Sequence, residues 1–265
     1  MLPLFRKIRW RLASENQFLK YSRYAIGEIV LVVIGILIAL QINTWNKNRV
    51  DRIEEQTYLK RLVENLNRDL ANLESVRRQH EGNLIFGTQI LDSLGVTSLG
   101  RIEVRPGYQN ALNGHSDEDI EIPETMGALF FNTLTIRIFY KSDIAFQELL
   151  STGKLDLIQN QVLRSSIQEH YLKATEAQSF QDKIVLTIQN NFRESLNDNN
   201  ISTLNQESLS EIMERIENAE DLVVATENFM GITEAILNMF IYGENSVKKG
   251  TEQLIDQISA EIDNN

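Results

Sequence analysis

The amino-acid sequence predicts an all-α protein with one N-terminal transmembrane helix followed by an antiparallel bundle of long helices. The first observation behind this prediction is the run from residue 25 to residue 42, which is aliphatic apart from four positions. At 1.5 Å per residue such a helix is about 27 Å long, close to the hydrocarbon thickness of a bilayer. The second is the recurrence of apolar residues every three or four positions beyond this run, in a chain of 265 residues with only 3 prolines and 13 glycines. This pattern is typical of amphipathic helices that pack together.

Residues 25–45 are predicted to cross the membrane once. The apolar run is longer than the roughly 7–15 residues of a signal-peptide core, and no small-residue cleavage site follows it. These features favour an uncleaved signal anchor over a cleaved signal peptide, and a buried core helix is the other alternative. Aromatic residues at both ends of the run are typical anchors at the membrane interface: Tyr21, Tyr24 and Trp45.

The distribution of charge predicts the orientation of this helix. Six basic residues and one acidic residue precede residue 25, whereas 20 basic and 35 acidic residues follow residue 42. Because Lys and Arg concentrate on the cytoplasmic side, we expect a single-pass protein of the bacterial inner membrane, with residues 1–24 in the cytoplasm and residues 46–265 in the periplasm. The acidic balance argues against a nucleic-acid partner, since such binding depends on Lys and Arg.

Residues 1–24 are predicted to be a basic amphipathic segment. Apolar residues recur there at helical spacing among four bases, Arg6, Lys7, Arg9 and Arg11. This arrangement suits a helix that lies on the anionic inner leaflet. A basic tail that only sets the topology is the alternative.

Three residues of the predicted span are candidates for contact with a partner. Glu28 lies about one turn inside the cytoplasmic end, where its carboxylate can reach headgroup water, stay protonated, or pair with Arg23 or Lys20. Glu28 is then an interfacial residue, and the alternative is a contact with a partner helix or an ion path. Gly35 and Ala39 form a small-xxx-small pair, which allows a second helix to approach closely.

Outside the membrane we expect a helical bundle over residues 46–265, with an irregular loop at about 95–124. The helical patterns cover residues 46 to about 94, a stretch from Glu124, residues 143–152 and 161–196, and about 206–217 and 220–262. Residues 135–140 are β-branched and aromatic, which favours a short extended piece between helices.

Local signals predict how the helix at 161–196 begins and which side it buries. Asn160 can cap its first turn, and Gly153 is placed to end the preceding helix. Its apolar stripe predicts several buried side chains, including Val162, Tyr171 and Phe180 and also Leu163, Ile167, Ala174, Ile184, Leu186 and Ile188.

No motif for catalysis or metal binding is present in the sequence. The histidines at 80, 115 and 170 form no H-E-x-x-H motif and no pair four residues apart, and the chain has no cysteine. There is also no G-x-S-x-G or G-x-x-x-x-G-K-[ST] pattern. We therefore expect no enzyme activity, no metal and no cofactor. An envelope hydrolase with paired carboxylates is an alternative, because such pairs have no fixed spacing in sequence.

Two segments carry a resemblance to a known family. FRKIRWRL at 5–12 and ENQFLKYSRYAIGEIVLVVIGILIALQINTWN at 15–46 closely resemble the N-terminus of a large family of single-span proteins from Bacteroidota, recorded as a domain of unknown function. AFQELLSTGKLDLIQNQVLRSSIQEHY at 145–171 is similar to a second signature of that family. The resemblance implies a helical inner-membrane protein from Bacteroidota, and it implies no activity.

These observations predict a non-catalytic, membrane-anchored helical module in the periplasm that senses, scaffolds or docks on an envelope partner. Its expected partners are the lipid bilayer and either another protein or a second copy of the chain, through the span and the bundle. Only about 24 residues lie before the span, too few for an effector domain, so a companion subunit is expected to carry any signal. The alternative is an accessory subunit of an ion-driven or transport complex that acts through Glu28.

Overall fold

The computed structural model describes residues 18–96, 123, 125–202, 211–212, 216 and 219–264. All regular secondary structure in these residues is helical, as the sequence predicts. The chain divides into two compact units, Met1–Thr57 and Tyr58–Asn265. Arg6, Lys7, Arg9 and Arg11, most of the expected loop at 95–124 and most of the expected helix at 206–217 lie outside the described residues.

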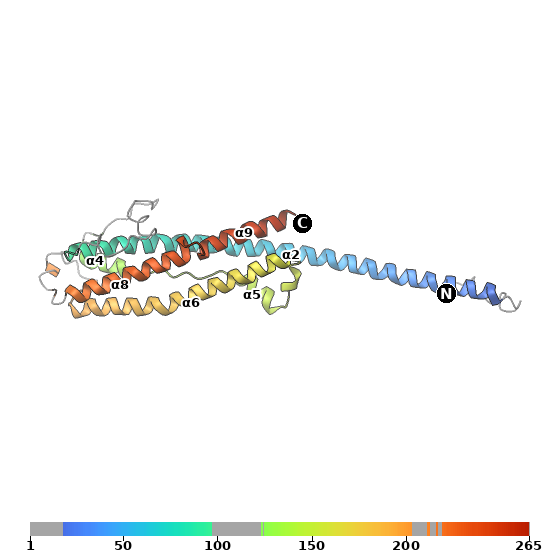
Figure 1. Cartoon of the computed structure of the whole chain (residues 1–265), viewed down its shortest axis with the longest axis horizontal. Helices are drawn as coiled ribbons and strands as arrows, with labels where there is room; N and C mark the ends of the chain where they lie inside the picture. Colours follow the sequence, from blue (N-terminus) through green and yellow to red (C-terminus); the bar gives the residue numbers. More distant parts are fainter. Residues whose placement is uncertain are drawn as a thin grey trace. The chain divides into compact units, whose positions relative to one another are not determined.

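The longest element is helix α2, Phe18–Ser93 (Figure 1). It contains the apolar run and continues beyond it without a break. No proline falls within residues 18–93, so the ladder of backbone hydrogen bonds is not interrupted. The helix ends in a turn in which the amide of Val96 donates to the carbonyl of Leu91, and Gly95 adopts a φ of 76° that glycine tolerates without strain.

The remaining helices belong to the second unit. They are α4 (Met126–Leu134), α5 (Ile144–Ser151), the 3₁₀ turn η2 (Leu155–Leu157), α6 (Gln161–Asp198), α8 (Ala219–Leu237), the π-helical turn η3 (Asn238–Tyr242) and α9 (Val247–Asp263). Helix α6 packs against both α8 and α9 and runs in the opposite direction to them (Figure 1). The core of this unit consists of apolar side chains from α2, α6, α8 and α9, with contributions from α4 and α5.

Two caps predicted from the sequence are confirmed. The side chain of Asn160 accepts hydrogen bonds from the backbone amides of Val162 and Leu163, which fixes the start of α6. Gly153 follows α5 with a φ of 66°, and the next amide, that of Lys154, donates to a carbonyl of the last helical turn.

Residues 135–143 form neither helix nor strand, and they cross the second unit between α4 and α5. Buried backbone groups outside regular structure need other partners, and here side chains of α2 and α6 supply them. Gln181 pairs with both the amide and the carbonyl of Phe139, at 3.1 and 3.3 Å. His80 pairs with the carbonyl of Arg137, and Asp69 accepts from the amide of Ser142. These contacts explain why polar residues occupy buried positions on two of the helices.

The expected apolar stripe of α6 is partly wrong. Val162, Phe180 and Leu186 are 76%, 42% and 62% exposed. Their neighbours Leu163, Gln181 and Val185 are buried instead. Gln181 is buried because its side-chain amide pairs with the backbone of Phe139. The spacing of apolar residues cannot identify such a buried polar position.

Two further helix boundaries differ from the sequence prediction. Helix α4 begins at Met126 rather than Glu124, because the side chain of Thr125 caps it by accepting from the amide of Ala128. The helix expected over 220–262 is broken between η3 and α9. A β-carbon at Gly243 would overlap the carbonyl oxygen of Asn238, so only glycine fits the turn that breaks the helix.

Candidate functional site

The apolar run of α2 has an exposed surface on every side. All residues from 29 to 50 are exposed, among them Leu31 at 71% and Trp45 at 66%. A helix that is apolar all round is typical of a buried or membrane-spanning segment. Among the described residues, one helix is long and apolar enough to cross a membrane, judged by length and composition.

The continuous helix places the three candidate contact residues of the apolar run on one face. Glu28, Gly35 and Ala39 are separated by seven and four residues in α2, so they lie on one face of the helix. A β-carbon at Gly35 would meet no atom within 4 Å, and Glu28 is half-buried. Whether this face contacts lipid or a partner helix stays a prediction.

The aromatic anchors are placed in the same helix. Tyr24 is half-buried and Trp45 is exposed, and Tyr21 belongs to α2 although its side chain lies outside the described residues. Their role at the membrane interface stays a prediction.

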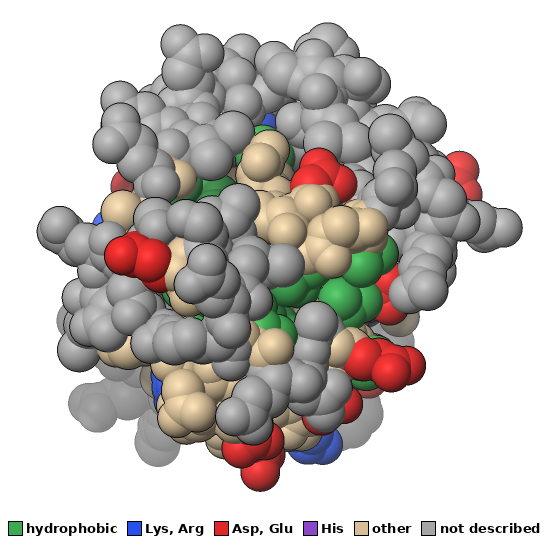
Figure 2. Space-filling model, turned by 90° about the vertical axis from the view of Figure 1, so that its left-hand side faces the viewer, with side chains coloured by type: hydrophobic (Ala, Val, Ile, Leu, Met, Phe, Trp, Pro, Cys, Tyr) green, Lys and Arg blue, Asp and Glu red, His purple; other side chains and the backbone are tan. Residues whose placement is uncertain are grey.

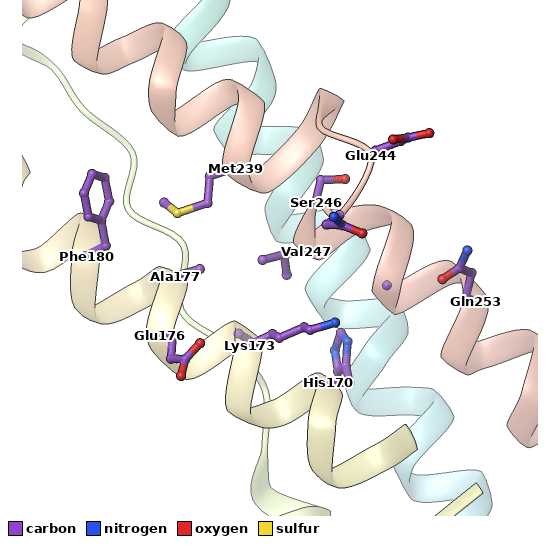
Figure 3. A pocket seen from close by; sticks show the side chains of 13 residues that line it. His170, Lys173, Glu176, Ala177, Phe180, Met239, Glu244, Ser246, Val247 and Gln253 are labelled. Atoms are coloured by element: carbon purple, nitrogen blue, oxygen red, sulfur yellow. The ribbon is translucent and has the colours of Figure 1, made fainter. Parts of the chain in front are cut away.

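A cavity of about 410 Å³ lies in the second unit, between α6 and the break that separates η3 from α9 (Figure 3). Its apolar lining consists of Ala174, Ala177, Phe180, Met239 and Val247. Figure 3 shows Ala177 and Val247 approaching this space from α6 and α9, and Met239 approaching it from η3. The small side chains on α6 create the hollow, because a larger residue at 174 or 177 would fill it.

Polar side chains of α6 line the same cavity. His170, Lys173 and Glu176 are three residues apart in sequence and therefore lie on one face of the helix. The ammonium group of Lys173 lies 2.8 Å from a carboxylate oxygen of Glu169, and both side chains are more than half exposed. Lys173 therefore lines this cavity while it is paired with Glu169, which lies outside the lining.

His170 is a buried polar residue of the cavity, at 8% exposure. Its Nε2 is buried without a hydrogen-bond partner among the described residues. Burial, and secondarily the positive charge of Lys173, lowers the pKa of His170 to about 4, so its imidazole is neutral at pH 7. A β-carbon at Gly250 would lie 3.4 Å from Nδ1 of this ring.

A second cavity of about 200 Å³ adjoins this side chain and continues along α6 and α9. It shares His170, Lys173, Gly250 and Gln253 with the larger cavity. The two hollows therefore adjoin each other at the imidazole of His170.

A partly buried ion-pair cluster joins α2 to the π-helical turn. Arg77 contacts carboxylate oxygens of Glu74 at 2.5 Å and of Glu81 at 2.6 Å. The hydroxyl of Tyr242 donates to Glu81. These carboxylates raise the pKa of Arg77, and burial followed by Glu81 raises the pKa of Tyr242. The cluster fixes the position of the π-helical turn next to the cavity.

The sequence analysis did not identify this cavity, because its residues come from segments about 70 positions apart. The sequence analysis considered His170 only as a metal ligand, and Gly250 inside an amphipathic pattern is a signal that it did not use. In the part of the chain that the structure describes, no three His, Asp or Glu residues are grouped to hold a metal ion.

Comparison with known proteins gives one match. The sequence profile of a family of unknown function (DUF6090) matches residues 28–105, which include most of α2. No curated protein and no solved structure matches the chain. The chain is therefore similar over this segment to a family of unknown function, in agreement with the coarser part of the resemblance drawn from the sequence.

Proposed function

We propose that the protein is a membrane-anchored helical module of the bacterial inner membrane, with its second unit in the periplasm. In this proposal α2 crosses the bilayer once, the helices of the second unit form an antiparallel bundle, and the module docks on an envelope partner without catalysing a reaction. The observation that carries it is the apolar run at residues 29–42, whose side chains are all exposed. In water such a surface would favour aggregation, whereas in lipid it is stable.

The charge on the two sides of the run supports the proposed orientation. Bases dominate before residue 25 and acids dominate after residue 42, which matches the positive-inside rule. On the end of the molecule shown in Figure 2, acidic side chains are more prominent than basic ones among the described residues. An acidic periplasmic unit favours partners with basic surfaces, by electrostatic complementarity.

The proposed anchor is tested by extraction with alkaline carbonate. The full chain is expected to stay in the membrane pellet, and a variant with Ile34→Arg and Leu37→Arg is expected to leave it, since each Arg at the centre of a span costs about 2.5–3.5 kcal/mol. The matched control carries Val50→Arg and Ile53→Arg, which lie beyond the run. Release of the wild-type chain by carbonate would refute the anchor.

A second candidate function is favoured by the shared face of Glu28, Gly35 and Ala39. In this alternative the span is an accessory helix of an ion-driven or transport complex, and Glu28 contacts a companion helix. Gentle detergent extraction followed by identification of the co-purifying proteins tests it. Glu28→Gln is expected to reduce a stoichiometric companion, whereas Gln41→Ala near the other end of the run is the control. An unchanged companion in Glu28→Gln would remove this alternative.

A further inference from the structure

We propose that a second copy of the chain docks on one face of α2, so that two copies form a parallel dimer through residues 29–57. The proposal rests on the single membrane crossing proposed above, and it names one partner of the module. Three features of α2 carry it: exposed apolar side chains beyond the apolar run, their spacing along the helix, and the charges that flank them.

Two apolar side chains are exposed in the polar part of α2 that follows the apolar run. Residues 46–57 read NKNRVDRIEEQT, in which Val50 and Ile53 are the aliphatic residues. These side chains are 49% and 60% exposed, and their spacing of three places them on one face of the helix. Glu55 follows Ile53 by two residues, which puts it on nearly the opposite side, and it is fully buried. Val50 and Ile53 therefore mark an exposed apolar face of α2 in the first unit.

The spacing of Val50 and Ile53 continues back through the apolar run as a heptad repeat. If Val50 takes position a and Ile53 position d, the a positions are Ile29, Ile36, Asn43, Val50 and Thr57, and the d positions are Val32, Ala39, Asn46 and Ile53. In a coiled coil a second helix covers such a seam with its own a and d residues. Within the run every face is apolar, so Val50 and Ile53 are the residues that select this one.

The residues at position a favour a parallel pair of helices. Apart from Asn43 they are all β-branched, and β-branched side chains at this position are typical of parallel two-stranded coiled coils. An asparagine at position a also fixes the register of two helices, since the two amides can hydrogen-bond to each other. Asn43 and its counterpart in the second copy would have this role near the end of the apolar run.

The charges beside Val50 and Ile53 complement each other in two parallel copies. Arg49 takes position g, and Glu54 takes position e of the next heptad, five residues later. In a parallel coiled coil these two positions lie beside each other across the interface, so the dimer brings Arg49 of each copy next to Glu54 of the other. Copies with the proposed topology all cross the membrane in the same direction, and only the parallel arrangement is then open to them.

Disulfide cross-linking of the full chain in membranes tests the dimer, because the natural chain contains no cysteine. Val50→Cys and Ile53→Cys place single thiols on the seam, and Asn48→Cys and Asp51→Cys place them on the other side of α2 as matched controls. After mild oxidation, the two seam variants are expected to give at least fivefold more cross-linked dimer than the two controls. Equal cross-linking at all four positions, or none at the seam, would overturn the proposal.

Charge reversal tests the parallel register. In the Ile53→Cys chain, Arg49→Glu is expected to reduce the cross-linked fraction about threefold, because two exposed ion pairs are lost. Addition of Glu54→Arg to this variant is expected to restore the fraction, and Asp51→Lys, a charge reversal away from the seam, is expected to leave it unchanged. An unchanged fraction in Arg49→Glu, or no recovery in the double variant, would refute the parallel seam.

Carbonate extraction of the same membranes separates this proposal from the proposed anchor. A chain that stays in the membrane pellet but forms no cross-link at the seam refutes the dimer and leaves the anchor intact. A chain that leaves the pellet refutes the anchor and the dimer together, because the parallel arrangement depends on a shared membrane crossing.

Discussion

Gln181 illustrates how single polar residues determine the interior of the second unit. Its side-chain amide is fully buried, and it satisfies both backbone groups of Phe139. Asp69 and His80 have the same role at neighbouring points of the segment 135–143. In each case one side chain replaces the backbone partner that a helix or a strand would provide.

Replacement of Gln181 by leucine is expected to destabilise the protein. The change keeps the approximate volume but leaves the amide and carbonyl of Phe139 buried without partners, at a cost of about 1–3 kcal/mol for each group. Urea unfolding followed by circular dichroism measures the loss. Gln168→Leu, at an exposed position of the same helix, is expected to change the unfolding free energy by less than about 0.5 kcal/mol. Equal effects of the two substitutions would contradict the role of Gln181.

Three buried titratable groups predict how stability depends on pH. Burial lowers the pKa of both His80 and His170 to about 4, from an ordinary value of 6.5. The contribution of the two neutral histidines to the free energy of unfolding is fully present above pH 6.5. It is lost as the pH falls toward 4, because the unfolded chain binds protons at these residues more readily than the folded chain does. Burial raises the pKa of Asp69 to about 6, against its hydrogen bond from Ser142. Asp69 therefore has the opposite effect: the folded chain binds a proton at Asp69 more readily than the unfolded chain, so this residue adds to the free energy of unfolding as the pH falls below about 6.

Asp69→Asn is therefore expected to make the protein more sensitive to acid. Asparagine retains an oxygen that can accept from Ser142 but removes the titration that opposes the two histidines between pH 6 and pH 4. The unfolding free energy of wild type and variant is measured by urea titration at pH 7 and at pH 4.5. The fall between these two values should be larger in the variant, and a smaller fall would contradict the assigned sign. Asp143→Asn, a more exposed neighbour, is the control.

At the scale of the elements, several local signals were interpreted correctly from the sequence, although the cap at Thr125 and the break at Gly243 were missed, and the non-local signals were not recognised. The cap at Asn160 and the stop at Gly153 depend on residues within one or two helical turns. The buried face of α6 depends on a segment about 40 residues away, so its polar member Gln181 could not be recognised from periodicity. The cavity combines α6 with residues near the start of α9, and no sequence pattern connects them.

The break between α8 and α9 depends on one glycine. Apolar residues continue at helical spacing on both sides of Gly243, and this is why the sequence suggested one helix. Gly243→Ala places a β-carbon against the carbonyl of Asn238 and is expected to destabilise the protein by about 1–3 kcal/mol, as overpacking does.

Gly231→Ala provides the matched comparison for this substitution. Gly231 lies inside α8 with no atom within 4 Å of a β-carbon, so alanine there is expected to raise the unfolding free energy by up to about 1 kcal/mol. Thermal unfolding of both variants measures the difference. A stable Gly243→Ala variant would show that the turn does not require glycine.

At the scale of the whole molecule, the account depends on the contrast between its apolar run and its acidic remainder. The run at 29–42 exposes aliphatic side chains, whereas the residues after 42 contain 35 acids and 20 bases. In the proposed topology, a bilayer covers the first surface, water solvates the second, and the bases before residue 25 keep the N-terminal end in the cytoplasm.

Two-sided cysteine labelling tests this central claim most directly, because the natural chain contains no cysteine. Ser14→Cys and Ser165→Cys place single thiols before the run and on the exposed surface of α6. In intact spheroplasts a membrane-impermeant maleimide is expected to label Ser165→Cys at once and Ser14→Cys only after the membrane is opened. Labelling of Ser14→Cys alone in intact spheroplasts, or equal labelling of both, would contradict the proposed topology.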